Sequence, residues 1–202
     1  MVKRARVMMA VLLVSALAAC DGGTPDTPTV SAPASTAAPA APAAEFPASP
    51  LRLPSVAPGE PCPVTEPHRW SDPDQAGRVL GPGPLYPVAD YFTNGALELR
   101  DQDRQHDGTY TKKVRWIGSG YSGPVLVRAG RIDAPGAAAV SFSYTGEPRD
   151  GGHYAVLTNP ESELPATTTV SGPGCFAYQV DGTSFSLTIV FRALPEAAAT
   201  PS

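Results

Sequence analysis

Residues 173–193 constrain the fold of this chain most, because they alone show the pattern of a complete β-hairpin. Along the second arm the apolar residues occupy every second position, and these are Phe185, Leu187, Ile189, Phe191 and Ala193. Polar residues fall between them, interrupted only by Val190. A period of two is typical of a strand that buries one face and leaves the other mostly wet. Phe176, Tyr178 and Val180 share a face of the first arm in the same way.

The turn of this hairpin is predicted at Asp181-Gly182. These residue types tolerate the positive φ angles of a type I′ turn, and such a turn fixes the register of the two arms. A second hairpin signal is Asn94-Gly95, which lies between the short apolar runs of residues 91–99. We therefore expect antiparallel neighbours at two places in the chain.

Further short strands are predicted along the same region, and they cover residues 85–88, 110–116, 125–128, 131–133, 140–144, 154–157 and 167–170. Residues 63–83 have no sustained apolar period and predict irregular structure. With the closing pair, this makes roughly eight or nine strands and no convincing amphipathic helix. The pattern predicts an all-β fold, an antiparallel β-sandwich of immunoglobulin-like type. A small closed β-barrel is the alternative.

Residues 1–19 have the layout of a lipoprotein signal peptide. Basic residues precede an apolar run that is too short to span a bilayer, which needs about 20 residues. The run ends in Leu17-Ala-Ala-Cys20, which resembles the lipobox of bacterial lipoproteins. This resemblance implies cleavage before Cys20 and lipidation of its thiol with acyl chains such as palmitate. An ordinary signal peptide, with Cys20 as an unmodified thiol, is the alternative.

The next segment, residues 20–61, is dominated by Pro, Ala, Thr and Ser and shows no hydrophobic period. We expect a disordered tether that holds a folded domain away from the lipid surface, because this composition favours extended chain over a packed core. Residues 194–202 have the same composition and predict a disordered tail. The remaining residues, 62–193, are expected to form one domain.

Two cysteines remain once Cys20 is assigned to the lipid anchor, namely Cys62 and Cys175. Export allows these thiols to oxidise, so we expect a disulfide that joins the start of the domain to its closing hairpin. The alternative is a pair of free thiols that bind a metal or carry out redox chemistry. The chain has no Cys-x-x-Cys, which disfavours that alternative.

Three motifs mark the domain: Cys62-Pro-Val-Thr65, the run from Gly123 to Asp133, and the sequence Pro-Gly-Cys-Phe-Ala-Tyr-Gln-Val-Asp-Gly-Thr at residues 173–183. Together they resemble a family of uncharacterised exported lipoproteins of soil and actinobacterial type. The resemblance covers about residues 62–193. It implies a small all-β domain with its two cysteines paired, and it implies no reaction.

The predicted loops contain a small set of side chains that could contact a ligand, namely Trp70, Asp101, Asp103, His106, Asp107 and Tyr121. The acidic loop departs from the calcium-binding EF-hand pattern, because His106 stands where that pattern needs glycine. Residues 118–123 match the Gly-x-Gly-x-x-Gly fingerprint, but Pro124 and a strand follow instead of a helix. We therefore predict no metal and no cofactor.

Charge and export together narrow the functional classes. Removal of the signal peptide leaves 12 basic against 19 acidic residues, a formal net charge of −7, which disfavours nucleic acid as a partner. The expected location is the extracytoplasmic face of the cell membrane, with Cys20 as the lipid anchor. The first hypothesis is a non-enzymatic binding or scaffold module that contacts an envelope protein or polysaccharide.

Two other hypotheses belong to different classes. One is an envelope-active hydrolase whose acid and base come from loop residues, with Asp101, Asp103, His106, Asp133 and His153 as the candidates. It requires that some of these groups share a cleft. The other is a metal-binding protein, with ligands drawn from distant loops.

Overall fold

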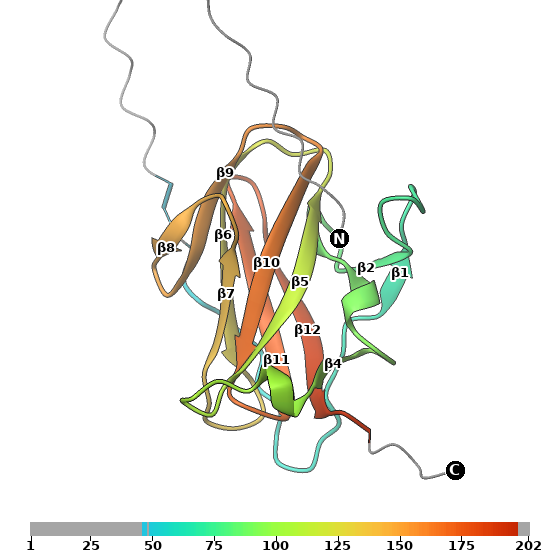
Figure 1. The fold of residues 1–202 in the computed structure, drawn as a ribbon. Coiled ribbons are helices and arrows are strands. Elements are labelled where there is room, and N and C mark those ends of the chain that lie inside the picture. Colours follow the sequence, from blue (N-terminus) through green and yellow to red (C-terminus); the bar gives the residue numbers. More distant parts are fainter. Residues whose placement is uncertain (1–45, 48, 198–202) are drawn as a thin grey trace, which may run out of the picture. The chain divides into compact units, whose positions relative to one another are not determined.

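The computed structural model describes residues 46–47 and 49–197, and within them the chain forms strands and short 3-10 helices (Figure 1). The predictions for residues 1–19, for Cys20 and for the tether up to residue 45 concern residues outside this described part, as do those for residues 198–202. No helix of the described part is long and apolar enough to cross a membrane. The elements, in chain order, are β1 (Pro67–Arg69), β2 (Arg78–Leu80), β3 (Leu85–Pro87), η1 (Ala89–Tyr91), β4 (Ala96–Leu99), η2 (Asp101–Asp103), β5 (Tyr110–Gly118), β6 (Gly123–Arg131), β7 (Ala138–Phe142), β8 (Glu147–Arg149), β9 (Gly152–Leu157), β10 (Ser162–Val170), β11 (Gly174–Gly182) and β12 (Ser186–Pro195).

Two sheets carry the fold. One has four strands in the order β3-β5-β10-β7, and the other has six in the order β4-β12-β11-β6-β9-β8. A separate two-stranded sheet joins β1 and β2. Neighbouring strands are antiparallel except β4 and β12, which are parallel. The predicted antiparallel β-sandwich is therefore confirmed, and the two large sheets are not joined into a closed barrel.

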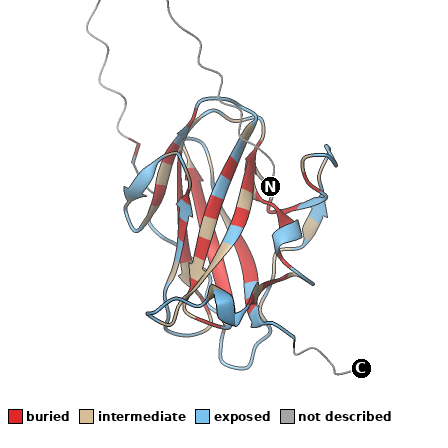
Figure 2. Ribbon diagram, in the orientation of Figure 1, coloured by how far each residue is buried: buried red, intermediate tan, exposed pale blue. Residues whose placement is uncertain are grey.

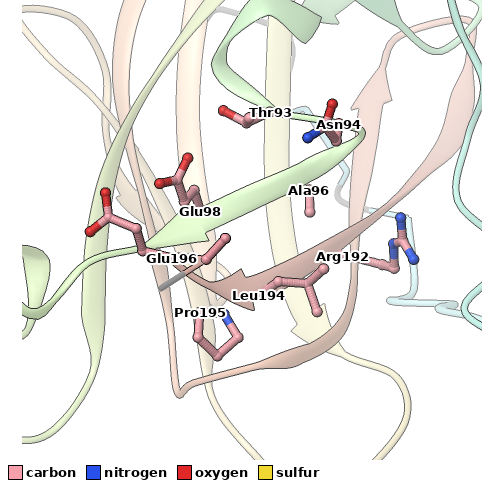
Figure 3. A pocket seen from close by; sticks show the side chains of 9 residues that line it. Thr93, Asn94, Ala96, Glu98, Arg192, Leu194, Pro195 and Glu196 are labelled. Carbon is pink, nitrogen blue, oxygen red and sulfur yellow. The ribbon is translucent and has the colours of Figure 1, made fainter. Parts of the chain in front are cut away.

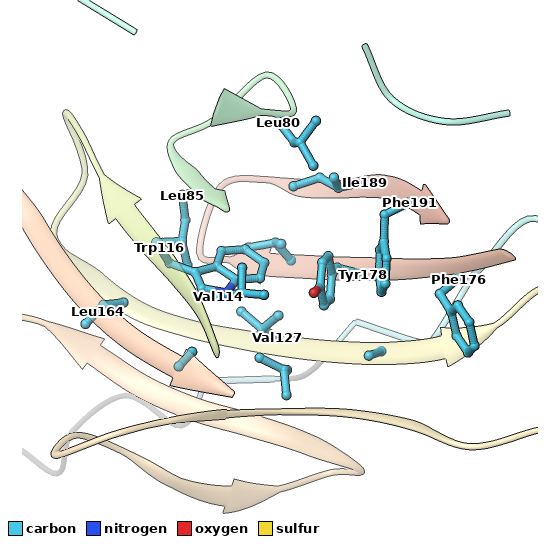
Figure 4. Close-up of a cluster of buried hydrophobic side chains, with 14 of the residues drawn as sticks. Leu80, Leu85, Val114, Trp116, Val127, Leu164, Phe176, Tyr178, Ile189 and Phe191 are labelled. Carbon is cyan, nitrogen blue, oxygen red and sulfur yellow. The ribbon is translucent and has the colours of Figure 1, made fainter. Parts of the chain in front are cut away.

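The core lies between the two large sheets, whose buried residues are marked along the strands in Figure 2. Figure 4 shows part of the cluster of buried side chains. Trp116 of β5 packs against Tyr178 of β11, with ring centroids 5.0 Å apart, and against Phe142 of β7 at 6.1 Å. Phe191 of β12 stacks on Tyr178 at 4.5 Å. All four side chains are buried, so the aromatic cluster joins the two layers.

The closing hairpin forms as β11 and β12, with Gly174 opposite Ala193 and Asp181 opposite Ser186. Its predicted inward faces are confirmed, but its predicted turn is wrong. Asp181 and Gly182 belong to the strand, and residues 183–185 connect it to β12, with a 2.9 Å hydrogen bond from the Gly182 N–H to the Phe185 carbonyl across the turn. The aromatic ring of Phe185 occupies the space that a side chain at Gly182 would need, which explains the glycine there.

The second hairpin signal is only partly confirmed. Asn94 and Gly95 have φ angles of 49° and 76°, and Thr93 bridges to Ala96 across them, so the tight turn exists. The segment before it is the 3-10 helix η1 rather than a strand. The segment after it, β4, pairs with β12 in parallel, a partner about a hundred residues away that no local turn could announce.

The ordered domain begins before Cys62, which corrects the predicted end of the tether at residue 61. The Val56 N–H donates a 2.8 Å hydrogen bond to the Ile132 carbonyl, and the Val56 side chain is buried. It packs with Ala177 and Val190 on the outer face of the six-stranded sheet. At the other end, β12 continues to Pro195, so the predicted tail starts inside a strand.

The predicted disulfide between Cys62 and Cys175 is confirmed. The Cα atoms are 5.6 Å apart and the two residues are separated by 113 positions in the sequence. The bridge ties the segment before β1 to β11, on the outer face of the sheet. For a loop of this length, the chain-entropy model gives a stabilisation of about 4 to 5 kcal/mol.

Candidate functional site

The six side chains predicted to contact a ligand lie in three separate places, because Asp101, Asp103, His106 and Asp107 share the loop before β5 and Trp70 and Tyr121 each lie elsewhere. Trp70 is half-buried after β1 and packs edge-on against Tyr86, with ring centroids 5.1 Å apart. Its indole N–H donates a 2.7 Å hydrogen bond to the Gln75 side chain. These contacts fasten the small β1-β2 sheet to the edge of the four-stranded sheet, so the structure gives Trp70 a packing role.

The acidic loop before β5 uses its carboxylates to hold its own shape. Asp103 forms an ion pair with Lys112 and accepts a 3.2 Å hydrogen bond from the Arg100 N–H. Asp107 accepts hydrogen bonds from the Thr109 hydroxyl at 2.7 Å and from the Thr109 N–H at 2.9 Å. The side-chain bond and then the backbone bond lower the pKa of Asp107. Asp101 and His106 are exposed beside them.

Tyr121 lies beyond the opposite end of β5. Its hydroxyl donates to the Pro124 carbonyl at 2.8 Å and accepts from the Thr183 N–H at 3.2 Å. Its ring packs edge-on against Phe185 at 5.1 Å. Because the nine residues of β5 separate it from the acidic loop, the two sites are about 27 Å apart along the strand.

The remaining acid and base candidates are also engaged locally. Burial by itself raises the pKa of Asp133, but the 2.7 Å hydrogen bond from the Arg131 guanidinium, together with backbone N–H groups, lowers it overall. His153 is buried, with Nε2 2.9 Å from the Thr145 carbonyl and Nδ1 3.4 Å from the Ser141 hydroxyl. The short contact to a carbonyl places a proton on Nε2. No described cleft brings these groups together.

Metal ligands are not assembled either. Among residues 46–47 and 49–197, no three His, Cys, Asp or Glu side chains gather in a group that could hold an ion. The alternative hypothesis of a metal-binding protein with ligands from distant loops therefore finds no support in the part of the chain that the structure describes.

A shallow pocket of about 320 Å³ lies beside β4 and the end of β12 (Figure 3). Charges of both signs line it, from Glu98, Arg192 and Glu196. Both carboxylates form ion pairs with Arg100, Glu98 at 3.5 Å and Glu196 at 3.2 Å. The pocket contains none of the predicted ligand-contact residues.

A larger pocket, of about 510 Å³, lies between β7 and the β8-β9 hairpin. The pairing of β7 with β10 is set by hydrogen bonds from Ser143 to Pro165 and from Ser171 to Ala137. Paired residues alternate along an antiparallel ladder, so the main-chain N–H and C=O of Val140 point away from β10, toward the free edge. That edge of β7 lines the pocket.

Two other sheet edges carry a proline that blocks further pairing. Pro87 lies in β3 and Pro148 in β8, each at the outer strand of its sheet. Proline has no N–H to donate, and natural sheets use it to protect exposed edges. In contrast, the sequence of β7, Ala-Ala-Val-Ser-Phe, has neither proline nor charge.

The outer face of the six-stranded sheet carries a buried polar group that we call the clamp, formed by Arg128, Gln179 and Asp181. The Arg128 guanidinium lies 2.6 Å from the Asp181 carboxylate. The Gln179 amide donates to both carboxylate oxygens, at 3.0 and 3.1 Å, and the Ser186 hydroxyl donates at 2.7 Å. All three clamp residues are at least nine-tenths buried.

The clamp is covered by residues 49–53, which we call the strap. Gln179 accepts the Arg52 N–H at 2.6 Å and donates to the Pro50 carbonyl at 3.0 Å. The Arg128 guanidinium donates to the Ser49 carbonyl. Every one of these hydrogen bonds goes to the main chain of the strap, whose side chains at Pro50 and Arg52 are exposed.

Apolar side chains hold the segment on both sides of these hydrogen bonds. Phe46 is buried and its ring centroid lies 5.9 Å from that of Tyr154 on β9. Leu53 sits over Gly130, where a Cβ would lie 2.5 Å from a Leu53 methyl group. The outer face thus contains a complete cradle for an extended segment of chain.

Sequence reasoning missed the clamp because the alternation of β11 and β6 marks this face as solvent-facing. The sequence does contain an indication of the clamp, because the charged residues Arg128 and Asp181 lie within two of the most apolar strands of the chain. In the structure, seven consecutive residues of β11 are buried, which requires cover on both faces.

Comparison with protein-family models, with curated proteins and with solved structures finds no match to this chain.

Proposed function

We propose that this chain is a membrane-anchored extracytoplasmic lipoprotein, and that its β-sandwich acts as a non-enzymatic binding or scaffold module of the cell envelope. The signal-peptide layout and the lipobox-like Leu17-Ala-Ala-Cys20 support the anchor. A disulfide between Cys62 and Cys175 suits an oxidising compartment. Membership of the exported lipoprotein family that the motifs resemble is part of the proposal.

One observation favours a binding role over catalysis. The candidate acids and bases lie in three separate places: Asp101, Asp103 and His106 on the loop before β5, Asp133 after β6, and His153 in β9. At each place one of them is already used in a local hydrogen bond or ion pair, namely Asp103, Asp133 and His153. General acid and base catalysis requires two such groups within reach of one substrate. Because these groups form contacts within the domain itself, the sandwich is better suited to binding a partner than to catalysis.

The partner we propose is an envelope protein or polysaccharide, reached from a tether that starts at the lipid on Cys20. The formal charge of −7 for the mature chain argues against nucleic acid. The uncharged edge of β7 and the pocket beside it form one surface on which such a partner would find unpaired main-chain groups.

A turnover assay tests the proposal against the hydrolase alternative. Purified Cys20→Ala chain, which lacks the anchor, is incubated with isolated cell envelope, and soluble fragments are followed by mass spectrometry over time. We expect no fragment whose amount grows with time and protein concentration. Release that disappears in Asp103→Asn or His153→Gln would establish an enzyme and overturn the proposal.

A further inference from the structure

We infer that the outer face of the six-stranded sheet is a binding site for extended, proline-containing segments of polypeptide, and that the strap closes this site in cis. The inference deepens the proposed binding role and rests on it. The occupant is identified by the segment already seated there, which has proline at positions 47, 50 and 54. Proline favours the extended conformation that such a cradle receives.

The clamp reads the main chain of its occupant. It offers one acceptor, the Gln179 carbonyl oxygen, to the Arg52 N–H. It offers two donors, from Gln179 and Arg128, to the carbonyls of Pro50 and Ser49. Since no side chain of residues 49–52 takes part, any extended segment with carbonyls and an N–H at these positions satisfies the clamp.

The energetics of the clamp favour a recognition role. Burying Arg128 and Asp181 costs desolvation that their attraction only roughly offsets, and an apolar pair would stabilise the sheet as well or better. The buried Arg128 Nε also has no hydrogen-bond partner. The strap therefore leaves one donor of the site unused, which a different occupant is free to fill.

The flanking contacts define the ligand further. Phe46 and Leu53 are seven residues apart and bury their side chains at opposite ends of the cradle, against Tyr154 and over Gly130. We therefore expect ligands with two large apolar residues at this spacing, which is about 22 Å in a polyproline conformation. An external ligand competes with a strap whose effective concentration is on the order of millimolar.

Fluorescence anisotropy with a labelled synthetic peptide of residues 44–54 tests the inference. The receptor is the chain carrying Cys20→Ala, either with an intact strap or with Phe46→Ala and Leu53→Ala, which remove both apolar anchors and open the site. We expect the open variant to bind the peptide at least about tenfold more tightly than the chain with the intact strap.

Two matched changes test main-chain recognition. Gln179→Ala in the open variant should weaken peptide binding about tenfold, whereas Gln102→Ala, in the exposed 3-10 helix η2, should not change it. A peptide with proline in place of Arg52 lacks the N–H that Gln179 accepts, and it should also bind about tenfold more weakly. Equal binding of the open and closed chains, or no effect of Gln179→Ala, would overturn the inference.

If circular dichroism shows that the open variant is unfolded, the chain with the intact strap serves as receptor. Millimolar peptide should then displace the strap and speed hydrogen exchange of the Arg52 amide, and an unchanged exchange rate would contradict the inference. The proposed function fails separately. If the chain binds envelope saturably and free peptide does not compete, only this inference is wrong.

Discussion

Arg128 and Asp181 form an ion pair in which the guanidinium nitrogen lies 2.6 Å from the carboxylate oxygen, and the two side chains are 7% and 0% exposed. The pair lies on the face of the six-stranded sheet that is turned away from the aromatic core. The strap covers it, so this sheet is buried on both sides at β11. By covering this face, the strap creates a second buried region in the domain, and this region is polar.

Removing one partner of this pair should destabilise the domain strongly. Asp181→Ala leaves the Arg128 charge buried without compensation and removes the acceptor for Gln179 and Ser186. We expect a loss of about 3 to 5 kcal/mol in the free energy of unfolding, measured by urea denaturation.

The double change Arg128→Met with Asp181→Leu should cost less than Asp181→Ala alone, because no charge is left buried. Glu98→Gln provides the control, since it breaks a partly exposed ion pair with Arg100 and should change stability by less than about 1 kcal/mol. A double variant that is less stable than Asp181→Ala would contradict the assignment.

Two glycines with similar backbone angles separate steric clash from backbone strain. Gly146 and Gly151 have φ angles of 79° and 74°. An added Cβ at Gly146 would lie 2.1 Å from the Tyr154 carbonyl oxygen, whereas at Gly151 it would meet nothing within 4 Å. Gly151→Ala should therefore cost about 1 kcal/mol, from the conformation alone.

Gly146→Ala should cost clearly more, because the backbone of β9 must also move. Thermal unfolding of the two variants, compared at equal buffer and pH, measures the difference. Equal losses in the two variants would show that the loop before β8 adapts, contrary to the packing described above.

Stability at alkaline pH should depend on Tyr178. Burial raises the pKa of its hydroxyl well above 10, and the hydrogen bond with Thr168, at 2.7 Å, only partly opposes this. Because the folded pKa is raised, the stabilisation is complete below the unfolded pKa of about 10 and is lost as the pH rises toward the folded value.

Urea midpoints measured between pH 8 and pH 11 should therefore fall more steeply for the wild-type chain than for Tyr178→Phe. Tyr144→Phe serves as the matched control, since Tyr144 is 99% exposed, and it should keep the wild-type slope. Parallel slopes for the wild-type chain and Tyr178→Phe would contradict this, because they would mean that the Tyr178 hydroxyl ionises as easily in the folded state as in the unfolded state.

The proposed anchor makes its own prediction. With Cys20 lipidated, the chain should sediment with membranes and partition into detergent, and its N-terminal residue after processing should be a modified Cys20. Cys20→Ser should move the chain to the soluble extracytoplasmic fraction. Without acyl chains, the apolar run before residue 20 is too short, and residues 20–61 are too polar, to keep the chain at a membrane. Unmodified Cys20 in the membrane fraction would contradict the lipidation.

The sequence predicts the inward faces of the sandwich well, because local alternation is a physical record of burial. Phe176, Tyr178 and Val180 are buried on the core side, as their period of two indicates. The disulfide follows from the small number of cysteines. Strand β8 escapes prediction because three residues that include Pro148 carry too little pattern.

Features that depend on distant partners escape for a different reason. The pairing of β4 with β12 joins residues about a hundred positions apart, and the turn at Asn94-Gly95 says nothing about it. The strap has a composition typical of tethers, and only a clamp elsewhere in the chain orders it. The polar face of β11 is predicted from the sequence to be solvent-exposed, because the strap that buries it is not part of the sheet.

A binding isotherm of the Cys20→Ala chain on isolated cell envelope tests the central claim, that this domain holds an envelope partner, most directly. The bound fraction is measured over a wide range of protein concentration. The control is a matched sample whose disulfide has been reduced and whose unfolding has been verified by circular dichroism. We predict saturable binding by the folded chain and none by the unfolded chain. Binding that never saturates, or that is equal for the folded and unfolded chains, would contradict the account.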